Sequence, residues 1–118
     1  KLKRKFVESS SFRRRLDKIG GNRLLNAIQY EILRNPEAGD LVQGSGGIRK
    51  IRVGDFKRGK SGAYRIFYLD LAEIGTTHLL YLLDKGEKEN ISQQEKNELK
   101  KVTQLLKSYA QKRGRENL

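Results

Sequence analysis

The side chains with the clearest chemical potential are cations that begin near the middle of the chain. They fall on two predicted neighbouring strands, in the loop between them and after the last strand: Arg49, Lys50, Arg52, Lys57, Arg58, Lys60, Arg65, Lys85 and Lys88. In an antiparallel meander, we expect the strand ends that carry them to converge on one concave surface. Cations there would stabilise the charge that develops on a scissile phosphate, while a positioned base takes a proton from an attacking 2′-hydroxyl. The alternative is a solvated basic surface that binds phosphates without chemistry, which by charge alone is the commoner case.

Other catalytic and metal-binding patterns are missing from the sequence. The chain has no cysteine and one histidine, which argues against thiolate sites, a cysteine nucleophile and a histidine-based zinc centre. It contains neither a G-x-S-x-G elbow nor a Walker loop, and its carboxylates do not form the converging set that a two-metal nuclease needs. The glycines at 44, 46 and 47 are interpreted as a turn, because no helix follows them directly. We therefore expect no metal and no cofactor.

The net charge narrows the class of partner. The 118 residues carry a net charge of +12, and residues 45–65 hold seven basic side chains and one acidic one, which is half of that surplus. A patch of this kind favours a polyanion, and nucleic acid is preferred over an anionic membrane surface. No apolar run is long enough to span a bilayer, and the start of the chain lacks the apolar stretch of a signal peptide. The sequence predicts one cytoplasmic domain over residues 1–118.

The elements that must position these cations follow from hydrophobic periodicity. A short strand from Lys3 to Val7 precedes two helices, the first capped by a serine run at 9–11 and the second ended by Asn35 and Pro36. Strands are expected at 48–53, 63–71 and 78–83, with a basic loop at 54–62. Ser92 and Glu95 form a capping box that begins a final helix, and residues 111–118 are expected to be a frayed tail.

Alternation within the strands assigns each side chain to a face. Arg49, Ile51 and Val53 share one face of their strand, and Ile48, Lys50 and Arg52 share the other. On the next strand, Arg65, Phe67 and Leu69 oppose Tyr64, Ile66 and Tyr68. The sequence predicts an α+β fold of order β-α-α-β-β-β-α, a curved antiparallel sheet with an N-terminal helical hairpin and a C-terminal helix.

Three runs of the sequence resemble one family when taken in order. They are GDLVQGSGGIRKIRV (39–53), GAYRIFY (62–68) and LLYLLDKGEKENISQQEKNELKKV (79–102). Together with the basic loop, they resemble the RelE superfamily of bacterial toxins, and most of all its HigB-type branch. The resemblance covers about four-fifths of the chain, from the helical hairpin to the final helix. Each run alone is moderately specific, and their order and spacing are quite specific.

The resemblance implies a ribosome-dependent mRNA interferase. Such toxins cleave mRNA in the ribosomal A site without a metal, by attack of a 2′-hydroxyl on the adjacent phosphate. The family's strand arginine maps onto Arg65, and its basic residue after the last strand maps onto Lys85, with Lys88 beside it. The residues expected to hold mRNA and ribosomal RNA are Lys50, Arg52, Lys57, Arg58 and Lys60. The implied partner is a helix-turn-helix antitoxin of the HigA type, and operator DNA is reached only through that antitoxin.

Several roles stay open on the sequence. The stretch after the last strand lacks the aromatic residue that some members place beside the phosphate, so Lys85, Asp84 and Glu87 are all candidates for the base. Arg65 could instead pair with Glu31 or Asp70, and His78 is expected to be structural. Tyr64 and Tyr68 could stack a base or pack beneath the helices. Two other functions remain: a ParE-like gyrase-poisoning toxin and a non-catalytic RNA- or ribosome-binding module.

Overall fold

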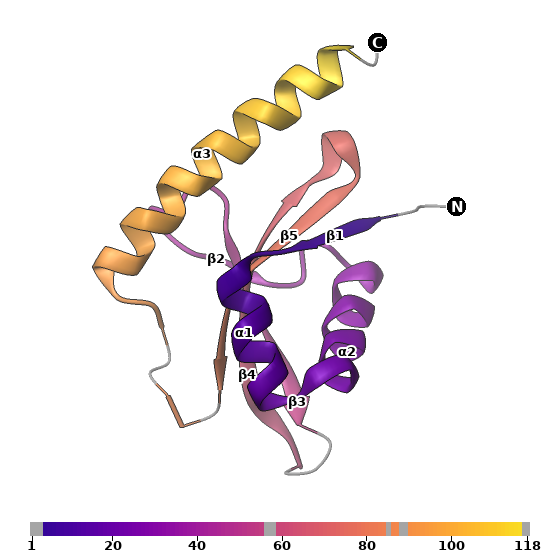
Figure 1. The fold of residues 1–118 in the computed structure, drawn as a ribbon, viewed down its shortest axis with the longest axis vertical. Coiled ribbons are helices and arrows are strands. Elements are labelled where there is room, and N and C mark those ends of the chain that lie inside the picture. Colours follow the sequence, from indigo (N-terminus) through magenta and orange to yellow (C-terminus); the bar gives the residue numbers. More distant parts are fainter. Residues whose placement is uncertain (1–3, 56–58, 85, 88–89, 117–118) are drawn as a thin grey trace.

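A mixed β-sheet with helices on both faces forms the molecule (Figure 1). The computed structural model describes residues 4–55, 59–84, 86–87 and 90–116, with side chains throughout except at 55, 59–63 and 116. The strands are β1 (Lys5–Glu8), β2 (Asp40–Leu41), β3 (Arg49–Asp55), β4 (Gly59–Leu71) and β5 (Thr76–Asp84). The helices are α1 (Ser10–Ile19), α2 (Gly21–Arg34) and α3 (Gln93–Glu116), with a short 3-10 turn at Ala72–Ile74.

The strand order β1-β5-β4-β3-β2 confirms the predicted α+β class and the antiparallel β3-β4-β5 meander. One part of the prediction is wrong: the sheet is mixed, because β1 runs parallel to β5. A strand that is followed by two helices is free to join a distant strand in either direction, and periodicity within a strand carries no signal for that choice. The sheet also gains the two-residue strand β2 at the edge next to β3.

The helical hairpin begins and turns at small residues. The Ser9 hydroxyl oxygen accepts a hydrogen bond from the Phe12 amide at 3.0 Å, which confirms the predicted serine cap of α1. Gly20 ends α1 and leads directly into α2. A Cβ at Gly20 would come within 2.7 Å of the Leu24 Cβ, so this position needs glycine for the two helices to meet.

The two faces of the sheet carry separate apolar cores, and we name each face by what covers it. On the hairpin face, α1 and α2 bury Phe12, Leu16, Leu24, Leu25, Ile28 and Ile32 against Ile51, Val53, Tyr64, Ile66, Tyr68, Leu79 and Leu82. On the α3 face, the buried residues are Ile48, Phe67, Leu69, Leu71, Leu80, Leu83, Ile91 and Ala110. This division confirms the predicted alternation on β3 and β4.

The capping box predicted for the last helix is present. The Glu95 amide donates to the Ser92 hydroxyl at 3.1 Å, and the Ser92 amide donates to the Glu95 carboxylate at 2.7 Å. From this cap, α3 runs along the edge of the molecule to Glu116 and so enters the segment expected to fray (Figure 1). The β5–α3 connection lies between Asp84, the last residue of β5, and Ser92, the residue that caps α3.

Candidate nucleic-acid interface

Two arginines lie directly opposite each other on the α3 face. Arg52 of β3 is the cross-strand partner of Arg65 of β4, and Lys50 pairs with Phe67 two residues further along. Arg52 is exposed, while Lys50 and Arg65 are half-buried. Like charges at directly opposed sheet positions destabilise a fold. An anion that bridges them would relieve that repulsion, so this arrangement suits a phosphate.

The carboxylates offered as partners of Arg65 are engaged elsewhere. Asp70 accepts a hydrogen bond from the Thr77 hydroxyl at 2.7 Å and forms an ion pair with Arg4. Glu31 lies 3.6 Å from Arg34 within α2. Alternation also places Asp70 opposite to Phe67 and Leu69, on the hairpin side of β4. The alternative of an Arg65 ion pair with either of these carboxylates is therefore wrong.

Arg49 shows what a structural arginine looks like on the same strand. Its guanidinium donates to the carbonyl oxygens of Gly39 at 2.7 Å and Glu37 at 3.2 Å. These bonds hold the segment after α2 against the sheet, on the hairpin side of β3. Arg49 therefore lies on the opposite face of β3 from Arg52, and its contacts are structural.

The structure describes only part of the predicted site. It places Arg65, Lys50 and Arg52 on one face, as predicted. Lys57, Arg58, Lys85 and Lys88 lie outside the described residues, and Lys60 lies on β4 in the part whose side chains are not described. Of the candidate bases, the Glu87 carboxylate accepts a hydrogen bond from the Asp84 amide at 2.7 Å and forms an ion pair with Arg15, so it closes the turn after β5.

The tyrosines of β4 pack beneath the helices. Tyr64 and Tyr68 are both buried on the hairpin face. The Tyr68 hydroxyl donates to the Pro36 carbonyl at 2.8 Å and accepts from the Gly39 amide at 3.1 Å, while burial raises the pKa of this phenol. The prediction that the Tyr64 and Tyr68 rings pack beneath the helices is therefore confirmed, and the alternative that they stack on a base is wrong.

Two further expectations were that His78 is structural and that the glycines at 44, 46 and 47 form a turn. His78 is half-buried on β5, and burial lowers the pKa of its imidazole. The glycine-rich segment is a turn: the Ser45 hydroxyl donates to the Val42 carbonyl at 2.6 Å and accepts from the Ile48 amide at 3.0 Å. Gly44, Gly46 and Gly47 have positive φ angles, which this turn requires.

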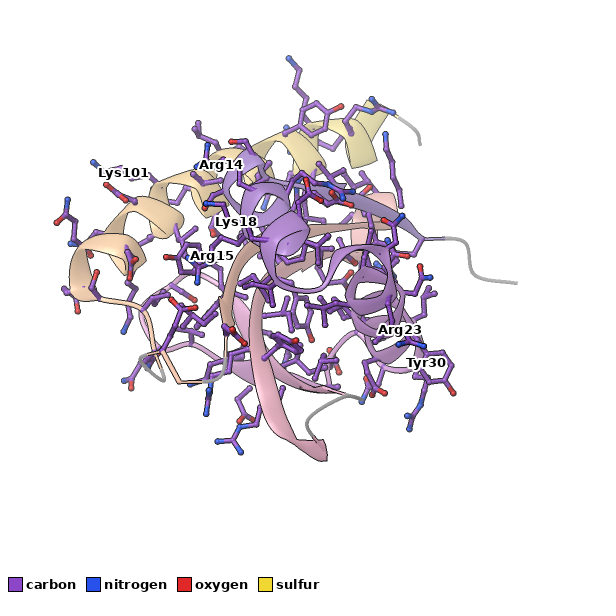
Figure 2. All side chains as sticks on the ribbon, turned by 60° about the horizontal axis from the view of Figure 1, so that its bottom comes forward. Arg14, Arg15, Lys18, Arg23, Tyr30 and Lys101 are labelled. Atoms are coloured by element: carbon purple, nitrogen blue, oxygen red, sulfur yellow. The ribbon has the colours of Figure 1, made fainter. Side chains whose placement is uncertain are left out.

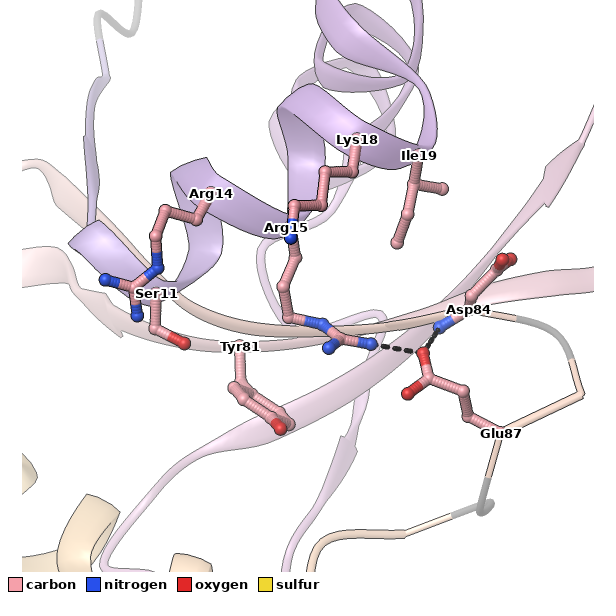
Figure 3. A pocket seen from close by; sticks show the side chains of 8 residues that line it. All are labelled: Ser11, Arg14, Arg15, Lys18, Ile19, Tyr81, Asp84 and Glu87. Carbon is pink, nitrogen blue, oxygen red and sulfur yellow. Dashed lines mark hydrogen bonds and ion pairs between the residues drawn. The ribbon is translucent and has the colours of Figure 1, made fainter.

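Sequence reasoning missed a pocket between α1 and the end of β5 (Figure 3). Its volume is about 420 Å³, and its lining includes Arg14, Arg15, Lys18, Tyr81, Asp84 and Glu87. The signal was present in the run SFRRRLDK, because two cations four residues apart lie on one side of a helix.

Neither a metal-binding cluster nor a membrane-spanning helix occurs among the described residues. Within residues 4–55, 59–84, 86–87 and 90–116, no cluster of three or more histidine, cysteine, aspartate or glutamate side chains could hold a metal ion. No helix in the described part of the chain is both long and apolar enough to cross a membrane.

Comparison with known proteins points to one family. The profile of the RelE toxin of the RelE/RelB toxin–antitoxin system matches residues 4–116. Among solved structures, the chain is similar to one in the intact E. coli RelBE toxin–antitoxin complex, with a TM-score of 0.54 and 22% identity over 73% of this chain and 100% of that one.

Two further structures of E. coli RelE show the same fold. A doubly mutated RelE in the free state matches with a TM-score of 0.54 and 20% identity, over 73% of this chain and 86% of that one. Isolated RelE matches with a TM-score of 0.53 and 17% identity, over 85% of this chain and 99% of that one. The predicted HigB-type branch stays a prediction. The family match spans nearly all of the sequence, and the chain belongs to the RelE family, the toxins of toxin–antitoxin systems.

Proposed function

We propose that this toxin is a ribosome-dependent endoribonuclease that cleaves mRNA in the A site. The 2′-hydroxyl of the nucleotide before the scissile bond attacks the adjacent phosphorus, and the 5′-oxygen of the next nucleotide leaves. Protein cations, rather than a metal ion, stabilise the charge that builds on the phosphoryl oxygens. Cleavage of messages on ribosomes inhibits translation, and the site of action is the cytoplasm.

The observation that carries this proposal is the cross-strand pair of Arg52 and Arg65. The pair places two guanidinium groups side by side on neighbouring strands of one face, where a single RNA backbone phosphate can contact both. Arg65 is assigned to the transition-state phosphate, since it is the more buried of the two and a less solvated cation interacts more strongly with charge. Lys50 and Arg52 are assigned to the flanking RNA backbone.

The remaining sequence assignments belong to the same proposal. Lys85 and Lys88 are proposed to act at the scissile phosphate from the β5–α3 connection, and Lys57, Arg58 and Lys60 to bind RNA from the β3–β4 hairpin. The base is Lys85 or Asp84, because the Glu87 carboxylate is held by Arg15 and the Asp84 amide.

The proposed protein partner is an antitoxin with a helix-turn-helix domain of the HigA type. Support for an antitoxin of some kind comes from the family and from the E. coli RelBE complex, in which the similar chain is bound to its antitoxin. The antitoxin would cover the cations of the α3 face or block entry of the toxin to the ribosome. Operator DNA would be bound through the antitoxin alone.

The test is a translation reaction with purified ribosomes and a defined mRNA, read by primer extension. Wild type, Arg65→Ala and Arg23→Ala are compared, because Arg23 is an exposed cation of α2 away from this face (Figure 2). Loss of one transition-state contact costs about 10²–10³ in rate. We expect discrete cuts with wild type and Arg23→Ala, and almost none with Arg65→Ala over the same interval.

Three other outcomes count against the proposal. An uncut message in every lane, with ribosome binding retained, identifies a non-catalytic binding module. Breaks in DNA with an intact message identify a gyrase poison. Cuts that require an added transition-metal ion, at the magnesium concentration that keeps ribosomes intact, would contradict the assignment of charge stabilisation to protein cations.

A further inference from the structure

The outer edge of β5 is closed by α1 rather than by a strand. β1 pairs with β5 only over Thr76–Leu79, which leaves the second half of β5 without a strand neighbour on that side among the described residues. The Ser9 hydroxyl donates to the Leu80 carbonyl at 2.8 Å, and the Arg15 Nε donates to the Leu82 carbonyl. These contacts fix α1 against β5, so the other side chains of α1 are presented at a defined distance from the strand.

The cations of α1 divide into those that are neutralised and those that are not. Arg13 forms ion pairs with Glu8 at 2.7 Å and Asp17 at 3.1 Å. Arg15 is paired with Glu87, and its guanidinium lies 5.6 Å from the centre of the Tyr81 ring. Among the described residues, no carboxylate lies within ion-pair distance of Arg14 or Lys18.

Arg14 and Lys18 reach into one pocket. They are four residues apart on α1, both are exposed, and both line the cavity of about 420 Å³ together with the Ser11 hydroxyl. In Figure 3, their side chains extend from α1 toward the side where Tyr81 lies. Two acidic residues also line the pocket. The Glu87 carboxylate is paired with Arg15, and Asp84 is the last residue of β5. Arg14 and Lys18 repel each other, and an anion between them would remove that cost.

The pocket adjoins the proposed cleavage site across one strand. Leu83 of β5 is the cross-strand partner of Arg65, and Tyr81 is the partner of Phe67, with ring centres 6.4 Å apart. Neighbouring strands are about 5 Å apart, so a polyanion that crosses β5 reaches both places. A single RNA strand has this property, because it carries a negative charge at every nucleotide.

We propose that the pocket between α1 and the outer edge of β5 is a second RNA-binding site, which takes a backbone phosphodiester of single-stranded RNA between Arg14 and Lys18 with the Ser11 hydroxyl as a donor. The Arg15–Glu87 pair forms the rigid wall of the site and is not itself a ligand. This site rests on the proposed function, since it holds the same strand that Arg65 is proposed to cleave.

The test measures binding, so that it is independent of cleavage. The reference is the full chain with Arg65→Ala, titrated into a fluorescent single-stranded RNA at salt concentrations from about 50 to 200 mM. The test variant adds Arg14→Ala and Lys18→Ala. The matched control adds Arg23→Ala and Lys112→Ala, which remove the same charge from exposed positions outside the pocket. All four positions are exposed, and thermal melts check that every variant folds.

The salt dependence distinguishes a phosphate contact from a loss of overall charge. Each phosphate contact with a single strand contributes about 0.7 to the slope of log K against log salt. We expect the slope to fall by about 0.7 and the affinity at the lowest salt concentration to fall several-fold in the test variant, with a clearly smaller change in the control. Equal changes in the two variants would overturn the proposal.

Two further arms identify the ligand class and separate this site from the proposed function. A poly-glutamate peptide is titrated into the same variants, and a loss of peptide binding that exceeds the loss of RNA binding would assign the pocket to an acidic protein segment instead. If the reference chain binds no RNA at the lowest salt concentration, the second site fails, and the proposed function is decided separately by the primer-extension assay on ribosomes. If the reference binds and the test variant is indistinguishable from the control, the second site alone fails.

Discussion

The two faces of the sheet are built for different tasks. The hairpin face is covered by α1 and α2, and its core extends from Ile51 and Val53 to Leu82 without a charged side chain. The α3 face has an apolar core, but beside it lie Lys50, Arg52 and Arg65 on adjacent strands. Residues of β3 and β4 point alternately to the two faces. The same two strands therefore contribute both to the apolar core that stabilises the fold and to the cationic surface.

Two arginines of β3 show that the side of the strand, and not the residue type, sets the role. Arg49 turns toward the hairpin side and donates to the carbonyl oxygens of Glu37 and Gly39. Arg52 lies on the α3 face opposite Arg65. The first arginine stabilises a loop, while the second raises the electrostatic energy of the folded state.

The largest effect is expected from a cavity on the hairpin face. Phe12 is fully buried there, and Phe12→Ala should lower the free energy of unfolding by about 3–5 kcal/mol. Urea denaturation followed by circular dichroism measures it. Val102→Ala on α3, where the side chain is 41% exposed, serves as control and should change stability by less than about 0.5 kcal/mol. If Phe12→Ala lowered the free energy of unfolding no more than the control does, the assignment of a stabilising core to the hairpin face would be refuted.

A smaller effect on the same face separates a hydrogen-bond role from an RNA-binding role. Tyr68→Phe keeps the ring but removes the hydroxyl that bridges Pro36 and Gly39. Because those buried backbone groups lose their partner, we expect a loss of about 1–3 kcal/mol in the free energy of unfolding. The rate of mRNA cleavage at a temperature where both proteins are folded should not change. Slower cleavage at unchanged stability would place Tyr68 in contact with RNA.

Period-2 alternation explains why the faces were predictable. Alternation alone puts Ile51 and Val53 on one face of β3, and Tyr64, Ile66 and Tyr68 on one face of β4, since the pleat leaves no other choice. Local caps were equally visible, because the contacts of Ser9 and Ser92 span three residues. Such features depend on neighbours in the chain, and the sequence contains them in full.

The features that were missed depend on contacts between distant segments. The parallel pairing of β1 with β5 joins residues about seventy positions apart. The α1 pocket needs Arg15 to meet Glu87, and no local pattern indicates that pair. A register shift near Phe67 and Tyr68 also places Leu80 and Tyr81 in the same core on the α3 face, which strict alternation forbids. Tertiary contacts of this kind are decided by the whole fold.

The smallest expected effect is the sharpest test of the comparison, because its sign is opposite to that of most mutations. Arg52→Ala removes the like charge opposite Arg65, so the free energy of unfolding should rise by about 0.2–1 kcal/mol. Arg49→Ala, three residues earlier, should lower it by about 1–3 kcal/mol, because two carbonyl oxygens lose a charged donor. Urea denaturation of the two variants at low salt measures both.

The same pair of variants should diverge again in function. Arg52→Ala should weaken binding of single-stranded RNA and reduce its salt dependence, whereas Arg49→Ala should leave both unchanged at a temperature where it is folded. Added salt should shrink the stability gain of Arg52→Ala, since it screens the repulsion between the exposed Arg52 and the half-buried Arg65. A variant that gains stability and loses RNA affinity would mean that Arg52 is kept on the α3 face for its ligand. If Arg52→Ala instead destabilises the chain, Arg52 belongs with Arg49 among the structural arginines, and the division of labour between the faces is wrong.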